Sequence, residues 1–414
     1  MLRLILGCSG SGKSEFFRRR LRRMAKSGEE RLMLIVPEQA SFENERAVLR
    51  LLGERDARRV LVTSFSRLTG EVQRHCGGFA GRRLDEGGRS IFMSLALEQT
   101  EDSLTVFRKS AKSSELTGRM LAASTEFKMC GISPEDLRKA AKNLSAGTLR
   151  QKAEEIALIL AAYDALVAQS YLDPLDDLTR LKNTLLEVPF FAGYTVMIDS
   201  FQSFTMQEYD IIELLLKQAR RVEIALCTDR LDDPEQGAGL FSVTRRTASN
   251  LIRLAKRNSV PVASPAVLKS GRRFQAPALA ALEAGAYRPA HSISAVSGWK
   301  GVFLYEASDA YDEASFVCAS IRRLVIQNGC RYRDFLVIAR DPENYRGILD
   351  DTMSRWEIPH FLDEPQEIDS EPLMRLLLSA FKIIQTGFSS DEIFPFLKTG
   401  LTGLSAEQIS WLEN

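Results

Sequence analysis

The sequence predicts an α/β protein built on a parallel sheet. Short apolar runs alternate with longer segments of helical periodicity, which is the pattern of parallel strands joined by helices. The first apolar run leads directly into a glycine-rich loop, and a helical segment follows that loop. In the first part of the chain, we expect strands at residues 2–6, 31–36 and 60–63 and helices at residues 13–27, 41–52 and 65–75. This repeated order of strand and helix predicts a doubly wound sheet.

The chain becomes mainly helical between residues 87 and 187. The sequences SSEL and SPEDL and the step Asp173-Pro174 fall in this stretch and are typical starts of helices. Strand, helix and strand patterns then return, in that order, at residues 194–198, 206–218 and 222–227. The first sheet is therefore predicted to be completed only after a helical insertion, so its domain is discontinuous in sequence.

A stretch between residues 260 and 300 is rich in Pro, Ala, Ser and Gly, a composition typical of a connection between domains. After it, we expect strands at residues 301–305, 335–339 and 360–362 and helices at residues 310–327, 342–356 and 372–386. The predicted parts are a first α/β domain, a helical insertion and a second α/β domain, at residues 1–86 plus 188–295, 87–187 and 296–414 respectively.

The composition is that of a soluble globular protein. Basic and acidic residues nearly cancel to a formal net charge of +1, so nucleic-acid binding would need a local basic patch. The six cysteines contain no Cys-x-x-Cys pair and are accompanied by only three histidines, which indicates no zinc or iron–sulfur site in this sequence. Free thiols fit a reducing cytosol, and no apolar run is long enough to span a bilayer. We therefore expect a cytoplasmic protein with no membrane partner.

The glycine-rich loop has the pattern G-x-x-x-x-G-K-[ST] and consists of Gly7, Cys8, Ser9, Gly10, Ser11, Gly12, Lys13 and Ser14. Glycines allow successive backbone N–H groups to turn inward around phosphates, where the start of the next helix adds its positive end. Lys13 is expected to reach the β and γ phosphates, and Ser14 to offer its hydroxyl to Mg²⁺. The sequence therefore predicts a site for a nucleoside triphosphate, ATP with Mg²⁺, formed by these eight residues.

A phosphate loop of this kind needs a second ligand for Mg²⁺, normally an Asp at the end of a neighbouring apolar strand. Asp199 ends the run Thr195–Ile198, so we assign the metal to Ser14 and Asp199; the alternative is an ordinary Asp that caps a turn. Motors that hydrolyse ATP usually have a Glu next, but Ser200 follows here, and a hydroxyl cannot act as a base near neutral pH. The sequence favours binding over turnover, and we assign no catalytic residue.

The helix predicted after the loop carries the run FFRRRLRRM at residues 16–24. Its apolar residues fall on one side and its arginines occupy the rest. This run is either a patch that contacts phosphates or, as is commoner for charge runs on helices, a solvated face paired with nearby acids.

Four stretches resemble the AddB family, also called RexB: VPEQASFENE, LVTSFSRL, VMIDSFQSFTMQE and LVIARDPENYRGILDDTMSRWEIPHFLDE, which begin at residues 36, 61, 196 and 336. AddB is the B subunit of a bacterial ATP-dependent helicase and deoxyribonuclease. The resemblance implies RecA-like, superfamily 1 helicase-like domains, the second of them incomplete. It also implies a module that binds ATP and single-stranded DNA in double-strand-break resection and recombinational repair. Its implied partners are an AddA-type helicase and nuclease subunit and single-stranded or duplex-end DNA.

In helicases of this type, the loops after the second and third strands lie along single-stranded DNA. The resemblance therefore implies a DNA-binding role for Gln39, Ser41, Phe65, Arg67 and Phe204. Amide and hydroxyl groups can bond bases or phosphates, an aromatic ring can stack on a base, and Arg67 can pair with a phosphate. The alternative is that Phe65 and Phe204 are core aromatics and that Gln39 is a loop amide.

Members of the family are longer and end in a nuclease domain with an iron–sulfur cluster on four cysteines, which this sequence does not contain. We therefore expect an N-terminal part of such a protein, with weak or no ATPase activity. Two other functions stay open: an autonomous DNA helicase motor, which DNA-stimulated ATPase activity would favour, and a small-molecule kinase, which phosphoryl transfer to a metabolite would favour.

Overall fold

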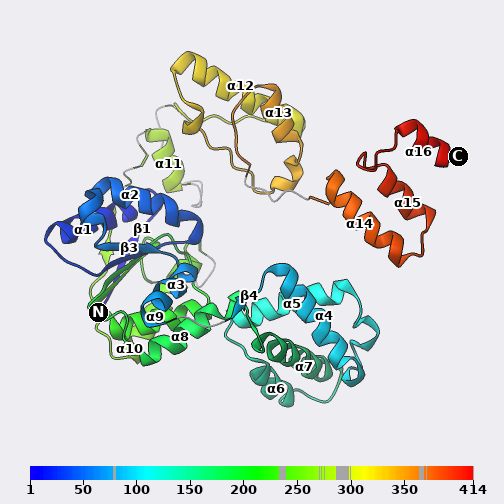
Figure 1. The fold of residues 1–414 in the computed structure, drawn as a ribbon. Coiled ribbons are helices and arrows are strands. Elements are labelled where there is room, and N and C mark those ends of the chain that lie inside the picture. Colours follow the sequence, from blue (N-terminus) through cyan, green and yellow to red (C-terminus); the bar gives the residue numbers. More distant parts are fainter. Residues whose placement is uncertain are drawn as a thin grey trace. The chain divides into compact units, whose positions relative to one another are not determined.

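The computed structural model describes residues 1–77, 81–232, 239–269, 271, 273–274, 276–285, 298, 300–362, 368–369 and 371–413 (Figure 1). The chain divides into two compact units, Met1–Val302 and Phe303–Asn414. The first unit contains the phosphate-loop sequence and the helical insertion.

A six-stranded parallel sheet, in the order β3-β2-β6-β7-β1-β8, forms the centre of the first unit. Its strands are β1 (Leu2–Gly7), β2 (Leu32–Ile35), β3 (Val60–Thr63), β6 (Thr195–Ile198), β7 (Arg221–Cys227) and β8 (Ala266–Val267). Most of their side chains are buried, as expected for parallel strands covered on both faces. The predicted α/β fold with a RecA-like parallel sheet is confirmed.

Helices cover both faces of this sheet (Figure 1). They are α1 (Lys13–Lys26), α2 (Glu38–Ala57), α3 (Phe65–Cys76), α8 (Asp177–Glu187), α9 (Met206–Gln218) and α10 (Ser242–Arg257). One core cluster joins the sheet to α1 and α2, and a second joins the opposite face to α3, α8, α9 and α10. The first unit is therefore a three-layer α/β/α structure.

The helical insertion has a hydrophobic core of its own, which includes the fully buried Tyr163. Its helices are α4 (Glu86–Thr100), α5 (Ser114–Met129), α6 (Pro134–Lys142) and α7 (Thr148–Ala168), with short 3-10 turns η1 (Glu101–Ser103), η2 (Arg108–Ser110) and η3 (Pro174–Asp176). The two-residue strands β4 (Arg82–Arg83) and β5 (Tyr171–Leu172) pair in parallel where the chain enters and leaves it. The helix α8, predicted with the insertion, instead adds Leu181 and Leu185 to the core of the sheet domain.

The predicted helix starts are confirmed by their caps. The Ser113 hydroxyl accepts from the Glu115 amide at 3.2 Å, Ser133 forms a capping box with Asp136, and Asp173 accepts from the Leu175 amide at 3.0 Å. Each side chain satisfies a backbone donor that the first turn of a helix leaves without a partner.

The stretch predicted as a connection, residues 260–300, adds structure to the first unit. Within it, β8 pairs with β1, and α11 (Pro277–Gly285) follows; residues 286–297 lie outside the described part. The prediction missed β8 because a two-residue strand is too short to show a period.

The second unit contains α12 (Ala310–Asn328), α13 (Ile348–Arg355), α14 (Pro372–Gln385), α15 (Ser390–Leu397) and α16 (Ala406–Glu413), with the 3-10 turns η5 (Tyr332–Asp334) and η6 (Pro342–Tyr345). In the described residues 301–305, 335–339 and 360–362, the predicted strands do not form. The side chains of Phe303 and Leu304 are 90% and 100% exposed, so this apolar run lacks the covering that stabilises a buried strand. An isolated strand is unstable without lateral partners.

A candidate nucleotide site and a pocket at the carboxyl edge of the sheet

The glycine-rich loop joins the carboxyl end of β1 to the amino end of α1. Gly10 and Gly12 have φ values of 74° and 93°, in the left-handed region that a residue with a side chain rarely adopts. The Lys13 ammonium turns back into the loop and donates to the carbonyl oxygens of Gly7 at 2.7 Å and Cys8 at 2.9 Å. The charge of Lys13 therefore lies at the centre of the loop, where a phosphate-binding lysine is expected.

The interior of the loop is closely packed and polar. A Cβ atom added to Gly7 would collide with the Ser11 hydroxyl oxygen, so only glycine fits there. That Ser11 hydroxyl is buried and has no hydrogen-bond partner in the described part of the chain. A buried hydroxyl without a partner is costly in a folded protein, and a bound phosphate oxygen would supply the missing acceptor. The loop thus fits an anionic ligand.

The remaining loop residues take different positions. Ser9 is exposed, whereas Cys8 and Ser14 are half-buried. Burial raises the pKa of the Cys8 thiol, with a further contribution from nearby acidic groups, so this thiol is neutral at physiological pH. A neutral thiol is a poor nucleophile, which agrees with an incidental side chain at this position.

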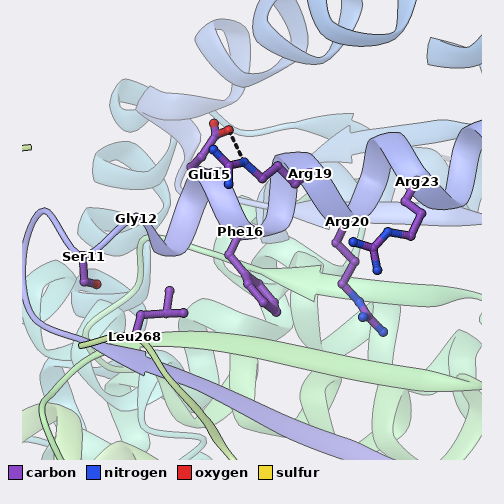
Figure 2. Close-up of a pocket in the computed structure, with 8 residues that line it drawn as sticks. All are labelled: Ser11, Gly12, Glu15, Phe16, Arg19, Arg20, Arg23 and Leu268. Atoms are coloured by element: carbon purple, nitrogen blue, oxygen red, sulfur yellow. Dashed lines mark hydrogen bonds and ion pairs between the residues drawn. The ribbon is translucent and has the colours of Figure 1, made fainter. Parts of the chain in front are cut away.

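A pocket of about 170 Å³ lies beside the loop, between α1 and the segment after β8 (Figure 2). It is lined by Ser11, Gly12, Glu15, Phe16, Arg19, Arg20, Arg23 and Leu268. Arg19 pairs with Glu15 at 2.8 Å, and Arg20 pairs with the buried Glu223 of β7 at 2.8 Å. The side chains of Arg19 and Glu15 are both exposed, as the solvated-face interpretation predicts, whereas Arg20 pairs with a fully buried acid.

The segment after β8 continues over the loop. The Leu268 amide donates to the Leu6 carbonyl at 2.8 Å, and the Arg273 amide donates to the Gly10 carbonyl at 3.3 Å. The Phe274 ring approaches within 3.0 Å of the position of a Cβ on Gly10. Gly10 therefore contacts a segment more than 250 residues later in the sequence, which the sequence pattern did not indicate.

Asp199 directly follows β6 and is 5% exposed. Its backbone amide donates to the Ile35 carbonyl at 3.0 Å, and its Oδ1 accepts from the Ser200 amide at 2.9 Å. One strand, β7, lies between β6 and β1, so the strands that lead into Asp199 and into the loop run about 10 Å apart. Mg²⁺ keeps several water ligands, and a water can span part of such a gap. Ser14 and Asp199 together fit a hydrated Mg²⁺ held mainly by phosphates. Among the described residues, no group of three or more His, Cys, Asp or Glu side chains is arranged to hold a metal ion.

Glu208, the next glutamate after Asp199, has a structural contact. Its carboxylate accepts from the Thr205 amide at 2.8 Å and completes a capping box at the start of α9. Burial raises the pKa of Glu208, which the hydrogen bonds from Thr205 oppose. The carboxylate is therefore engaged with the start of its own helix.

A second pocket, of about 400 Å³, lies at the carboxyl ends of β2, β3 and β6, where the insertion meets the sheet domain. Val36, Pro37, Glu38, Ser64, Phe65, Ser66, Phe201, Thr205, Gln207 and Glu208 line it from the sheet domain, and Arg83, Met129, Pro174, Leu175, Asp177 and Leu178 from the insertion and α8. The carboxyl edge of a parallel sheet is where α/β proteins bind ligands.

The structure brings some of the predicted DNA-binding residues together beside this pocket. Arg67 donates to the Ser41 hydroxyl at 3.0 Å and to Glu45 at 2.6 Å, and Gln39 is exposed in the first turn of α2. Phe65 and Phe204 are only 4% and 9% exposed and pack edge to face, with ring centroids 6.1 Å apart. A base could stack on either ring only after a neighbouring side chain moved, so these two aromatics are parts of the core in this structure.

A carboxylate and hydroxyl cluster lies at the same edge, in the loops after β2 and β3 that were expected to lie along single-stranded DNA. Ser64 donates to Glu38 Oε2 at 2.6 Å, and Ser66 donates to the same oxygen. Glu38 begins α2 shortly after the end of β2, and Ser64 comes directly after β3. The sequence does show that polar residues follow both strands. To predict that these residues meet, one must also know that β2 and β3 pair in parallel.

The six-stranded sheet, with the glycine-rich loop after β1, defines the chain as an α/β protein of the RecA-like class. The family model described as ADDB, N-terminal, matches residues 4–283. The chain therefore belongs to the AddB family. Several curated relatives are named as the B subunit of an ATP-dependent helicase/deoxyribonuclease. Those of Acetivibrio thermocellus, Thermoanaerobacter sp. strain X514 and Clostridium botulinum strain Langeland are 33%, 32% and 31% identical over 419, 417 and 419 residues.

Each of these alignments covers 100% of this chain and 36% of the relative. The names of the relatives associate them with a helicase, a deoxyribonuclease and an assembly of subunits. Across the described residues, the helices are all too short or too polar to cross a membrane.

Proposed function

We propose that this chain is the N-terminal ATP-binding and single-stranded-DNA-binding module of an AddB-type subunit. Such a subunit would act in the cytoplasm in double-strand-break resection and recombinational repair, beside an AddA-type helicase and nuclease subunit. An iron–sulfur cluster would belong to the C-terminal part of the longer relatives. Family membership and the glycine-rich loop support this proposal.

The observation that carries the nucleotide part is the interior of the loop. Two left-handed glycines open it, Lys13 places a positive charge inside it, and the buried Ser11 hydroxyl has no partner among the described residues. The start of α1 adds its backbone N–H groups and the positive end of its dipole. In the bound state, the phosphates would replace the two carbonyl oxygens as partners of Lys13, and Ser14 and Asp199 would hold Mg²⁺.

The DNA part is supported by the pocket at the carboxyl edge of the sheet. It combines polar groups at Glu38, Ser64 and Gln207 with the edge of Phe65, and Arg67 lies beside it. The Arg67 side chain is 41% exposed, and its guanidinium could exchange its contact with Glu45 for a phosphate. Such binding would weaken as salt increases, because bound counterions are released from the strand.

Calorimetric titration with Mg·ATP tests the nucleotide site. Lys13→Ala should abolish or strongly weaken binding and leave the circular dichroism spectrum unchanged. Lys26→Ala, at the other end of the same helix, should bind like wild type. Equal ATP affinity of wild type and Lys13→Ala would contradict the proposal.

Fluorescence anisotropy with labelled single-stranded DNA tests the second site. Gln39→Ala/Arg67→Ala should weaken binding at low salt, whereas Glu115→Gln/Arg119→Gln, which removes an exposed ion pair from α5, should not. No binding by wild type at low ionic strength would show that these loops are structural in this chain.

A further inference from the structure

A third pocket lies at the amino-terminal edge of the sheet, opposite the edge that holds the candidate nucleotide and DNA sites. It has a volume of about 420 Å³ and is lined by Glu30, Arg31, Leu32, Arg55, Arg58, Arg59, Leu61 and Tyr194. These residues precede or begin β2, β3 and β6, or end α2. Four arginines from two separate segments therefore line one hollow, together with a single acidic residue.

The charges in this pocket are unevenly paired. Arg59 contacts Glu30 at 3.3 Å and Asp56 at 3.7 Å, so the one lining acid already has a partner. Arg55 and Arg58 are exposed and, within the described residues, neither forms an ion pair. A chain whose net charge is +1 thus concentrates unpaired positive charge at this edge.

Two further lining residues are held in fixed positions. Arg31 has a φ of 58°, its guanidinium donates to the Ala192 carbonyl at 2.8 Å, and its own carbonyl accepts from the Thr195 amide at 3.0 Å. The ring of Tyr194 is half-buried and stacks on Phe190, with ring centroids 5.7 Å apart and planes 20° from parallel. A fixed cation and a supported aromatic ring therefore accompany the two free guanidinium groups.

We propose that this pocket binds the sugar–phosphate backbone of a nucleic acid strand. Guanidinium groups bind phosphate oxygens through paired hydrogen bonds, and several of them spaced along a hollow match consecutive phosphates better than one small anion. A positive groove that also offers an aromatic ring is the usual combination in proteins that hold single strands. The proposal rests on the proposed function only in taking DNA as the ligand, because the residues differ from those of the other two sites.

The test uses the whole chain and a fluorescently labelled oligonucleotide, with anisotropy measured over a series of salt concentrations. The variant is Arg55→Gln/Arg58→Gln, which removes two exposed charges without touching the core. The matched control is Arg119→Gln/Arg138→Gln, which removes the same charge from exposed positions on α5 and α6. Circular dichroism and the melting temperature establish that both variants are folded.

We expect the pocket variant to bind single-stranded DNA about tenfold more weakly at low salt, since each lost contact is a charged hydrogen bond. The slope of log K against log salt should fall by about 1.4, because each phosphate contact with a single strand contributes about 0.7. The control should keep the wild-type affinity and slope. Equal losses in the two variants would overturn the proposal, because they would reflect only net charge.

Comparison with Gln39→Ala/Arg67→Ala separates this proposal from the proposed function. If only the pocket variant loses affinity, the amino-edge site stands and the carboxyl-edge assignment fails. If only Gln39→Ala/Arg67→Ala loses affinity, the amino-edge proposal fails. A third outcome is that the pocket variant keeps its DNA affinity but no longer binds poly-glutamate, which the wild type binds. This result would assign the pocket to an acidic protein partner and would also overturn the amino-edge proposal.

Discussion

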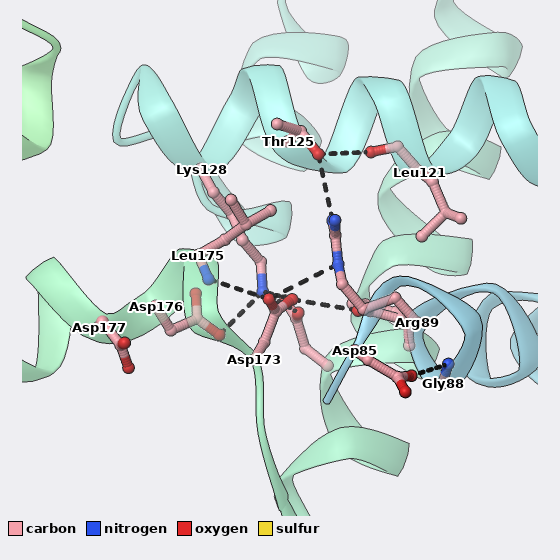
Figure 3. Close-up of polar contacts among 12 residues, drawn as sticks. Asp85, Gly88, Arg89, Leu121, Thr125, Lys128, Asp173, Leu175, Asp176 and Asp177 are labelled. Atoms are coloured by element: carbon pink, nitrogen blue, oxygen red, sulfur yellow. Dashed lines mark hydrogen bonds and ion pairs between the residues drawn. The ribbon is translucent and has the colours of Figure 1, made fainter. Parts of the chain in front are cut away.

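The ammonium group of Lys128 lies 3.0 Å from the carboxylate of Asp173, inside the helical insertion (Figure 3). Lys128 is near the end of α5, and Asp173 precedes η3, where the chain leaves the insertion and returns to the sheet domain. The Asp173 side chain is fully buried and also accepts from the Tyr163 hydroxyl at 3.0 Å. Burial alone would lower the pKa of Lys128, but Asp176 and the other nearby carboxylates outweigh it and raise this pKa. The pair therefore fixes the exit of the insertion.

Asp173→Ala should lower the free energy of unfolding by about 3 kcal/mol, because removing one partner of a buried pair leaves polar groups without compensation. Asp102→Ala is the control, because the Asp102 side chain is 98% exposed where it contacts Arg108. This substitution should lower the free energy of unfolding by about 0.5 kcal/mol or less. Urea denaturation followed by circular dichroism measures both. Similar losses for the two variants would show that the buried network contributes no more than a surface pair.

Glu155 gives the insertion a dependence on pH. Its buried carboxylate accepts from the amides of Thr105, Val106 and Phe107 at 2.9 to 3.1 Å, so it holds the turn before η2. Burial would raise the pKa of Glu155, but the hydrogen bonds from the Thr105 hydroxyl and these amides outweigh it and lower the pKa. A lowered pKa means that the ionised form stabilises the fold above the unfolded pKa, and that this stability is lost as pH falls through the folded pKa.

Glu155→Gln should therefore be less stable than wild type at pH 7 by about 1–3 kcal/mol. The difference should narrow as pH falls below about 4, near and below the ordinary pKa of glutamate. Unfolding measured at pH 7, 5, 4 and 3 checks this, with the exposed neighbour Glu154→Gln as a control that stays close to wild type throughout. A difference that does not change with pH would contradict an ionised Glu155.

Alanine substitutions at Gly7 and Gly70 distinguish a steric clash inside the loop from the general effect of replacing a glycine. Gly7→Ala should abolish Mg·ATP binding, because its new methyl group would collide with the Ser11 hydroxyl. Gly70→Ala lies within α3 with nothing near its new methyl group, and should stabilise the protein by about 0.5–1 kcal/mol with unchanged ATP affinity. Calorimetry and thermal denaturation measure the two effects. Normal ATP affinity in Gly7→Ala would show that the Ser11 hydroxyl is free to turn away.

Sequence patterns predicted the parts of the fold that local chemistry determines. The strands β1, β2, β3, β6 and β7 and the glycine-rich loop followed from apolar runs bounded by turn residues. Contacts between distant segments could not be predicted this way. Phe65 and Phe204 pack against each other although they are far apart in sequence, and β8 joins the sheet through only two residues. The apolar runs of the second unit had a strand composition, but composition does not specify a partner strand.

In the candidate site, too, features set by consecutive residues were predicted, whereas contacts between distant segments were not. The loop residues were predicted as one group because they are consecutive, and Asp199 was predicted because it ends an apolar strand. The ion pair between Arg67 and Glu45 and the hydrogen bond from Arg273 to Gly10 depend on which elements lie side by side, so the sequence alone could not indicate them.

We expect this chain to bind Mg·ATP but to hydrolyse it slowly, with or without DNA. Ser200 follows Asp199 where a motor would have a glutamate, and loss of general-base assistance costs about 10² to 10⁴ in rate. An arginine that completes such a site across a domain cleft contributes a further factor of about 10³ or more in phosphoryl-transfer enzymes. Glu208 is a poor substitute as the base, because its carboxylate caps α9 through Thr205.

Phosphate release at saturating ATP measures this for wild type, Ser200→Glu and Glu208→Gln, each with and without single-stranded DNA. We expect wild type to turn over well below about one per second, the lower end for working kinases. Glu208→Gln should keep that low rate and also keep its capping box, because the glutamine oxygen can accept the same hydrogen bond from the Thr205 amide. Ser200→Glu should raise the rate if its carboxylate reaches the water, although the φ of 69° at Ser200 limits how its side chain can point. Wild-type turnover of about one per second or more that disappears in Glu208→Gln would show that Glu208 leaves its cap to act as the base, and would contradict the expectation of slow hydrolysis.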